Sequence, residues 1–230
     1  SFVHSYIVTL SVGDNFETAT TLDSVGYNFY KLFYETNVVN AENLILPATT
    51  LASNCYDSIF AKCTSLTTAP QLPAMTLVNR CYYYMFYKCT SLTTAPILPA
   101  RTLATYCYEG MFDGCTSLTT APSILPATTL AECCYQHMFE NCTSLTRAPE
   151  LPATTLADYC YYHMFYGCTS LTTAPELLAT TLVNSCYQSM FEGCKSLNYV
   201  KCLATDISAD SCTNSWLSNV STTGTFVKDA

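Results

Sequence analysis

The sequence is short of charge, of glycine and of long apolar runs, and each shortage excludes a class of protein. Only 11% of the 230 residues are charged, and the net charge of −8 argues against a nucleic-acid ligand, because phosphate binding needs an excess of Lys and Arg. No apolar run reaches the roughly 18–20 residues that a membrane-spanning helix needs. Seven glycines leave little material for phosphate-binding loops, and no nucleophile elbow or Ser–His–Asp pattern is visible. The sequence therefore indicates a protein that is not an enzyme.

What the chain has in abundance is an internal repeat. The string CTSLTTAP starts at Cys63, Cys89, Cys115 and Cys168, and a variant with Arg147 starts at Cys142. The phenylalanine before each cysteine gives a period of 26 or 27 residues, through Phe33, Phe60, Phe86, Phe112, Phe139, Phe165 and Phe191. Periods of 20–50 residues are typical of solenoids and propellers, and a propeller blade needs about 40 residues. The repeat therefore predicts a solenoid with one coil per repeat.

Each repeat has two halves with different spacing. Leu77, Cys81, Met85, Phe86 and Cys89 follow the spacing of one apolar stripe on a short helix. The Thr-rich segment 91–95 favours a short strand, and the proline after it prevents further ladder pairing. We therefore expect an α/β solenoid with short parallel strands on one side and short helices on the other. Because strands stack at about 4.8 Å and helices at about 8–10 Å, the helical side is expected to be convex.

The pattern F-x-x-C-x-S-L-x-x-[hydrophobic]-x-x-P resembles the BspA-like leucine-rich repeats of bacterial surface proteins of the Bacteroides type, over about residues 29–217. The resemblance implies a right-handed leucine-rich-repeat superhelix, display on the cell surface or secretion, and adhesion to a protein or glycan of a host or of the bacterial envelope. It implies no catalytic residues and no cofactor. A lipid anchor, where one exists, would lie upstream of Ser1.

The chain divides into three parts on this pattern. Residues 1–28 fit no repeat and are interpreted as a strand that caps the first coil or as the remnant of a preceding domain. Residues 29–220 form the solenoid, with degenerate repeats at both ends that serve as caps. Residues 221–230 form a C-terminal tail. Oligomeric state is not indicated.

Fifteen cysteines would normally suggest a disulfide framework. Here twelve of them fall in two columns, eight residues apart within a repeat, which is too far for a bridge if that segment is helical. We interpret them as small buried hydrophobic residues. A metal site is less well supported, because no C-x₂₋₄-C pair has a partnering pair. Cys133, Cys202 and Cys212 lie outside the columns and are the best candidates for a bridge or a reactive thiol.

The columns that differ between repeats are the place to look for a binding site. They carry two groups of tyrosines on the expected helical side, and two histidines one repeat apart. The candidate partner-binding residues are Tyr83, Tyr84, Tyr87, Tyr159, Tyr162, Tyr166, His137 and His163. Tyrosine on a surface of low charge is typical of recognition patches, although it is also tolerated as surface filler. The histidine pair has the shape of a weak metal site, but the interpretation as exposed surface residues is favoured, and no metal ligand or catalytic residue is assigned.

Three functions stay open at this point. The favoured one is a surface recognition or adhesion module that binds a protein or a glycan. The second is a structural spacer or assembly subunit of an envelope complex, and the third, weaker one is a carbohydrate-active enzyme. The repeated Thr pairs of the strand side suit a repetitive glycan, whereas the variable Tyr columns suit a protein partner.

Overall fold

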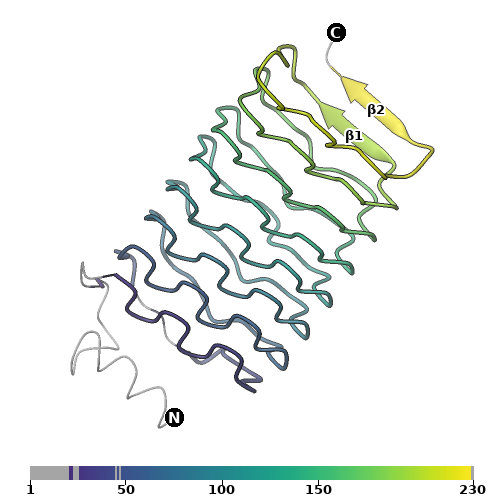
Figure 1. Cartoon of the computed structure of the whole chain (residues 1–230). Coiled ribbons are helices and arrows are strands. Elements are labelled where there is room, and N and C mark those ends of the chain that lie inside the picture. The colour runs from purple at the N-terminus through teal and green to yellow at the C-terminus, as the bar shows by residue number, and fades with distance from the viewer. Residues whose placement is uncertain (1–20, 23–25, 45, 47, 229–230) are drawn as a thin grey trace.

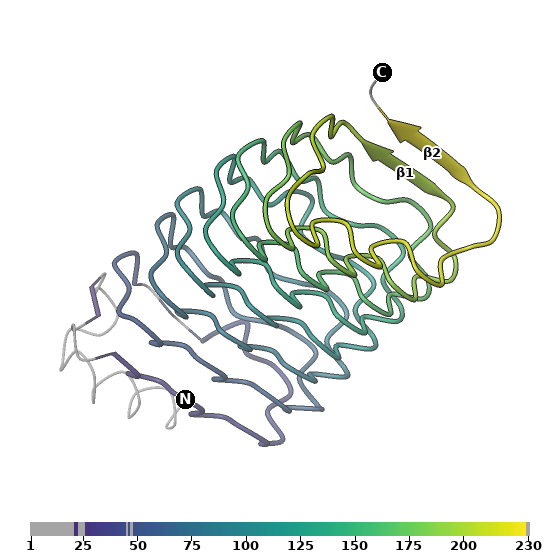
Figure 2. The ribbon, with the colours of Figure 1, turned by 45° about the horizontal axis from the view of Figure 1, so that its top comes forward.

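The protein is a stack of coils, one coil per repeat, as the period predicts (Figure 1). The computed structural model describes residues 21–22, 26–44, 46 and 48–228. Successive coils follow one another from the N-terminal to the C-terminal end, where β1 (Tyr199–Cys202) and β2 (Thr225–Lys228) lie side by side (Figures 1 and 2). The two strands are parallel, with Tyr199 opposite Thr225 and Cys202 opposite Lys228.

On the threonine side of the stack, neighbouring coils are joined mainly by single parallel bridges, such as Thr94 to Thr120 and Arg147 to Thr173. Proline explains why the predicted strands stay so short. The amide of Ala95 donates to the carbonyl of Thr120 at 2.9 Å, but the next residue, Pro96, has no N–H to continue the ladder. At the corresponding place in the last full repeat the chain has Lys201 instead of proline, and there a four-residue strand, β1, forms.

The expected short helices are wrong: the residues that the structure describes contain no helix, and so none with the length and apolar character to cross a membrane. The segment that should be helical is a ribbon of consecutive β-turns. In the coil of Tyr82, alternate amides close turns within the coil, for example Met85 N–H to Tyr82 O at 3.3 Å. The amides between them donate to the next coil, for example Tyr84 N–H to Glu109 O at 2.8 Å.

The sequence contains the reason for this difference. Inward residues come in pairs every four residues (Cys81 and Tyr82, then Met85 and Phe86), and all are at most 1% exposed. An α-helix has 3.6 residues per turn, so a strict period of four drifts by about 40° per period and would rotate the stripe out of the core. The backbone also has positive φ at every fourth residue, at Arg80, Tyr84 and Lys88 in this coil. Each of these is the third residue of a turn, where a type II turn requires positive φ and where an α-helix cannot continue.

The core consists of ladders of identical side chains, one from each coil. The phenylalanine rings from Phe33 to Phe191 stack on one another with centroids 5.3–5.6 Å apart. A second ladder of stacked rings is formed by the invariant tyrosines Tyr56, Tyr82, Tyr108, Tyr135, Tyr161 and Tyr187. The rings are much closer than the 8–10 Å of packed helices. The turn side is thus bonded from coil to coil like the threonine side, and it lacks the wider helix spacing that was expected to make it convex.

All fifteen cysteines are buried and carry free thiols, in agreement with the interpretation as small core residues. Cys133, Cys202 and Cys212, the candidates for a bridge or a reactive thiol, are also unpaired and at most 5% exposed, so the structure contradicts that expectation. The second cysteine of each repeat has a specific partner: the thiol of Cys115 donates to the carbonyl of Phe86 at 3.1 Å, and the same bond recurs from coil to coil. The carbonyl of Phe86 therefore accepts two hydrogen bonds, one from the amide of Cys89 in its own coil and one from the thiol of Cys115 in the next coil.

Coil-to-coil bonding extends beyond the predicted solenoid of residues 29–220. Thr21 bridges to Thr50, and the amide of Leu22 donates to the carbonyl of Thr50 at 3.0 Å. In the predicted tail, β2 adds a last strand to β1. Residues 1–20 and 23–25 lie outside the described part of the chain, so the interpretation of residues 1–28 stays a prediction.

Candidate functional site

All eight candidate residues lie on one surface, the outward side of the turn ribbons, which we call the turn face. Between successive inward pairs lie two residues on the outer side of the ribbon, and these form the columns that vary from repeat to repeat; some of them, such as Asp57, Glu109 and Ser189, are themselves buried. Tyr83, Tyr84, Tyr87, Tyr159, Tyr162, Tyr166, His137 and His163 are each half-buried. The turn face therefore exposes part of each of these side chains, and the remainder is covered by neighbours.

The first tyrosine cluster is ordered by ring contacts. Tyr83 and Tyr84 meet edge to face at 4.7 Å, and Tyr84 and Tyr87 do so at 5.3 Å. The ring of Tyr84 lies over Gly110 of the next coil, where a Cβ would collide with it. Arg80 places its guanidinium 5.1 Å from the centroid of Tyr83, so a ring of this cluster already accepts a cation.

The second cluster combines the other three tyrosines with the histidines. His163 is sandwiched between Tyr162, at 4.1 Å and 13° between ring planes, and Tyr166, at 4.8 Å and 10°. Tyr159 contacts Tyr162 at 5.9 Å. His137, from the preceding coil, meets Tyr162 edge to face at 5.3 Å and His163 at 5.1 Å. The structure thus brings His137, His163 and the second tyrosine group into one contiguous cluster.

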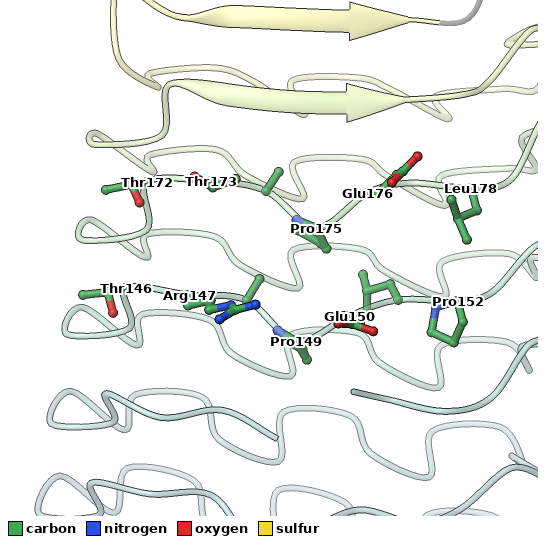
Figure 3. A pocket seen from close by; sticks show the side chains of 13 residues that line it. Thr146, Arg147, Pro149, Glu150, Pro152, Thr172, Thr173, Pro175, Glu176 and Leu178 are labelled. Atoms are coloured by element: carbon green, nitrogen blue, oxygen red, sulfur yellow. The ribbon is translucent and has the colours of Figure 1, made fainter. Parts of the chain in front are cut away.

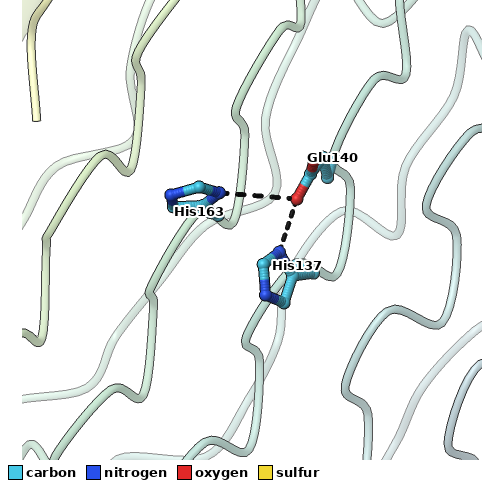
Figure 4. A group of neighbouring side chains, drawn as sticks. All are labelled: His137, Glu140 and His163. Carbon is cyan, nitrogen blue, oxygen red and sulfur yellow. Dashed lines mark hydrogen bonds and ion pairs between the residues drawn. The ribbon is translucent and has the colours of Figure 1, made fainter.

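Glu140 completes this cluster, and the sequence reasoning missed it. Its carboxylate hydrogen-bonds to Nδ1 of His137 and lies 3.6 Å from Nδ1 of His163, and Figure 4 shows both rings directed at it. Burial alone would raise the pKa of Glu140, but the two histidines outweigh it and lower the pKa to about 2. Glu140 stands in a variable column three residues after His137, and that spacing is the signal that could have grouped it with the histidines.

Two further carboxyl groups lie on the coil before the histidines. Burial raises the pKa of Glu109 to about 7, against the opposing effect of His137 and Arg80. Burial and the nearby charge of Glu140 raise the pKa of Asp113 to about 6. In the four turn ribbons spanning residues 106–114, 133–141, 159–167 and 185–193, the sequence has four acidic residues and no Lys or Arg. This half of the turn face is therefore acidic and aromatic.

The opposite side of the stack offers a different kind of site. A groove of about 740 Å³ runs between two coils, with Thr146, Arg147 and Glu150 on one coil and Thr173 and Glu176 on the next (Figure 3). Arg147 is the single replacement within the five copies of the repeated string, and its side chain is exposed. Glu176 is paired with Lys201 at 2.5 Å. The groove combines these polar side chains with the rings of Pro149, Pro152 and Pro175.

Comparison with known sequences gives one result. A family described as BspA type Leucine rich repeat region (6 copies) matches residues 15–145 and 132–228. Searches of curated proteins and of solved structures gave no match. The matched residues include the whole turn face described above.

Proposed function

Because the chain belongs to the BspA-type leucine-rich-repeat family, we propose that it is a non-catalytic recognition module, displayed on a cell surface or secreted, that binds a protein through its turn face. The partner is a protein surface that presents arginine and lysine side chains. The observation that carries the proposal is the combination of two ordered tyrosine clusters with an acidic half that has no Lys or Arg.

The chemistry of the face supports a cationic partner. Half-buried tyrosines offer a large contact area and lose little conformational entropy on binding. A guanidinium stacks on tyrosine rings and pairs with carboxylates, and Arg80 already does the first of these, over Tyr83 at 5.1 Å and over Tyr106 at 4.8 Å. Carboxylates between the rings attract the partner and determine its orientation.

The variation between coils favours selective binding of a partner over a role as a structural spacer. The core columns repeat almost without change, whereas the outward columns differ from coil to coil and place a different side-chain set on each. A spacer would need no such heterogeneity, and a repetitive glycan would match a repetitive surface better.

The test uses an oligo-arginine peptide, an oligo-lysine peptide of the same length, and a panel of bacterial and host surface proteins. Arginine should bind more tightly than lysine, because the planar guanidinium both stacks flat on rings and pairs with a carboxylate through two N–H groups. The variant Tyr84→Ser, Tyr87→Ser, Tyr162→Ser, Tyr166→Ser keeps the net charge and should abolish binding of the peptide and of any protein found. Each buried aromatic anchor is worth about 2 kcal/mol or more, or about 30-fold in affinity.

The matched control removes two tyrosines outside the clusters, Tyr27 and Tyr30, which are 56% and 45% exposed on the first coil. Tyr27→Ser, Tyr30→Ser should bind normally. Equal binding by the unchanged protein, the four-tyrosine variant and the Tyr27→Ser, Tyr30→Ser variant would contradict the proposal. If the unchanged protein binds neither the peptides nor any protein of the panel, the structural spacer is favoured.

A second candidate function rests on the groove of Arg147. Its threonine hydroxyls, its arginine and its proline rings suit a glycan chain lying along the coils. Arg147→Thr, which restores the repeated string, should weaken glycan binding if this groove is the site and leave binding at the turn face unchanged.

A further inference from the structure

We propose that His137, Glu140 and His163 form a binding site for a single divalent transition-metal ion of the zinc class. The ligand atoms of the three side chains all lie within 4.8 Å of one another. Two imidazoles and one carboxylate are a donor set that zinc takes in proteins with an open fourth position. The proposal concerns a new site and does not depend on the proposed function.

The backbone holds the three ligands in place before any ion binds. The amide of His137 donates to the carbonyl of Tyr162 at 2.9 Å, and that of His163 donates to Gln188 at 3.1 Å. Both histidines have φ of 55°, so both occupy the same position of the turn ribbon in adjacent coils. Histidine is one of the few residue types that tolerate this conformation.

The rings are held as well. Tyr162 and Tyr166 clamp His163 from both faces and leave its Nδ1 directed at Glu140 (Figure 4). Nε2 of His137 lies 3.1 Å from the side-chain amide of Gln136. Rotation of that amide by half a turn presents its oxygen, which accepts the Nε2 proton and frees Nδ1 of His137 for a metal.

The distances suit a metal after a small adjustment. Ligand atoms about 2.0–2.2 Å from a tetrahedral zinc are about 3.3–3.6 Å apart. Nδ1 of His163 and the Glu140 oxygen are 3.6 Å apart, close to that spacing. His137 and Glu140 are in direct hydrogen-bond contact, which an ion would replace as both atoms move slightly apart. The half-buried position of all three side chains leaves the fourth coordination position open to solvent or to a partner's side chain.

The experiment titrates the metal-free protein with ZnCl₂ by calorimetry, and with CoCl₂ by visible absorption, in reducing buffer. One ion should bind per chain, with a tetrahedral Co²⁺ spectrum and no thiolate charge-transfer band. Loss of an outer-sphere hydrogen bond alone costs about 10–100-fold in metal affinity. His137→Asn, His163→Asn and Glu140→Gln, each of which removes a ligand, should therefore weaken binding by at least about 100-fold. Asparagine also tolerates positive φ, so these variants should fold.

The matched control is Glu192→Gln. Glu192 occupies the position of Glu140 two coils later, where the neighbours at the histidine positions are Ser189 and Ser215. It should bind zinc like the unchanged protein. All variants keep the fifteen cysteines, so metal bound through thiols would still bind to every variant. That result would overturn the proposal. The absence of 1:1 binding to the unchanged protein would also overturn it. Circular dichroism with a chelator present checks that each variant is folded; should His163→Asn fail this check, His137→Asn and Glu140→Gln decide the outcome.

Discussion

Replacement of Phe112 by alanine tests the ladder that holds the coils together. The ring has no exposed surface and is stacked between Phe86, at 5.6 Å, and Phe139, at 5.4 Å. Truncating a buried phenylalanine costs about 3–5 kcal/mol, and the cost is highest where the surroundings cannot collapse into the cavity. Here the coils on both sides are fixed by backbone bonds, such as Phe112 N–H to Met138 O at 2.9 Å. We therefore expect a loss of about 4–5 kcal/mol.

The control for this experiment is Phe33→Ala at the first described coil. Phe33 is half-buried and, among the described residues, stacks on one ring, Phe60 at 5.3 Å. Because fully burying a phenylalanine is worth about 1.5–3 kcal/mol, its loss should cost about 1–2 kcal/mol. Urea unfolding followed by circular dichroism and by Trp216 fluorescence measures both variants. A cost below about 1 kcal/mol for Phe112→Ala, or equal costs at the two positions, would refute the stacked-ladder account.

Three further predictions concern buried polar groups. All fifteen thiols are buried, and burial raises the pKa of Cys107 and Cys194 to about 12, so a thiol reagent at pH 8 should label the folded protein far more slowly than the unfolded one. All fifteen thiols should react after unfolding without reductant; thiols missing in pairs would reveal disulfides. The folded protein holds the proton of Glu109 up to a pKa of about 7, above the ordinary 4.5, so stability should fall as pH rises between these values. Glu109→Gln, measured with a chelator present, should remove that fall and stabilise the protein at pH 8 by about 3 kcal/mol, and an unchanged pH profile would contradict the assignment. The buried hydroxyl of Tyr135 has no hydrogen-bond partner among the described residues, so Tyr135→Phe should be neutral or stabilise by about 1–2 kcal/mol; a loss of stability in urea unfolding would mean that the hydroxyl is satisfied.

The sequence predicts the fold at the level of the repeat. The recurrence of Phe33 to Phe191 identifies the coil, and the columns of identical residues predict the ladders, because identical side chains from stacked coils must meet. The buried cysteines follow from the same reasoning. Each of these inferences needs only the period and the chemistry of one column.

The helices could not be predicted correctly from the apolar stripe alone. The pairs Cys81–Tyr82 and Met85–Phe86 fit a helix over two turns, and only the strict period of four over the full segment distinguishes a turn ribbon. Single residues do not reveal the positive φ, because Arg80, Tyr84 and Lys88 are not residues that normally adopt it. Their conformation is imposed by the hydrogen bonds to the next coil.

The sequence predicts which residues form the candidate site more completely than it predicts how they are grouped in space. The eight residues were found because they vary between repeats, and all lie on one face. Their grouping depends on which side chains touch across coils, which the period does not determine. Glu140 was missed since it is an acidic residue in a variable column, with no motif of its own.

The most direct test of the central claim is backbone amide exchange of the protein with and without bound oligo-arginine peptide. If the turn face is the binding surface, slowing of exchange on binding should be concentrated in residues 83–87 and 159–166, while the amides of Thr93, Thr94 and Thr173 on the opposite side exchange as before. Slowing confined to the threonine side, or spread evenly over the stack, would contradict the assignment of the turn face as the recognition surface.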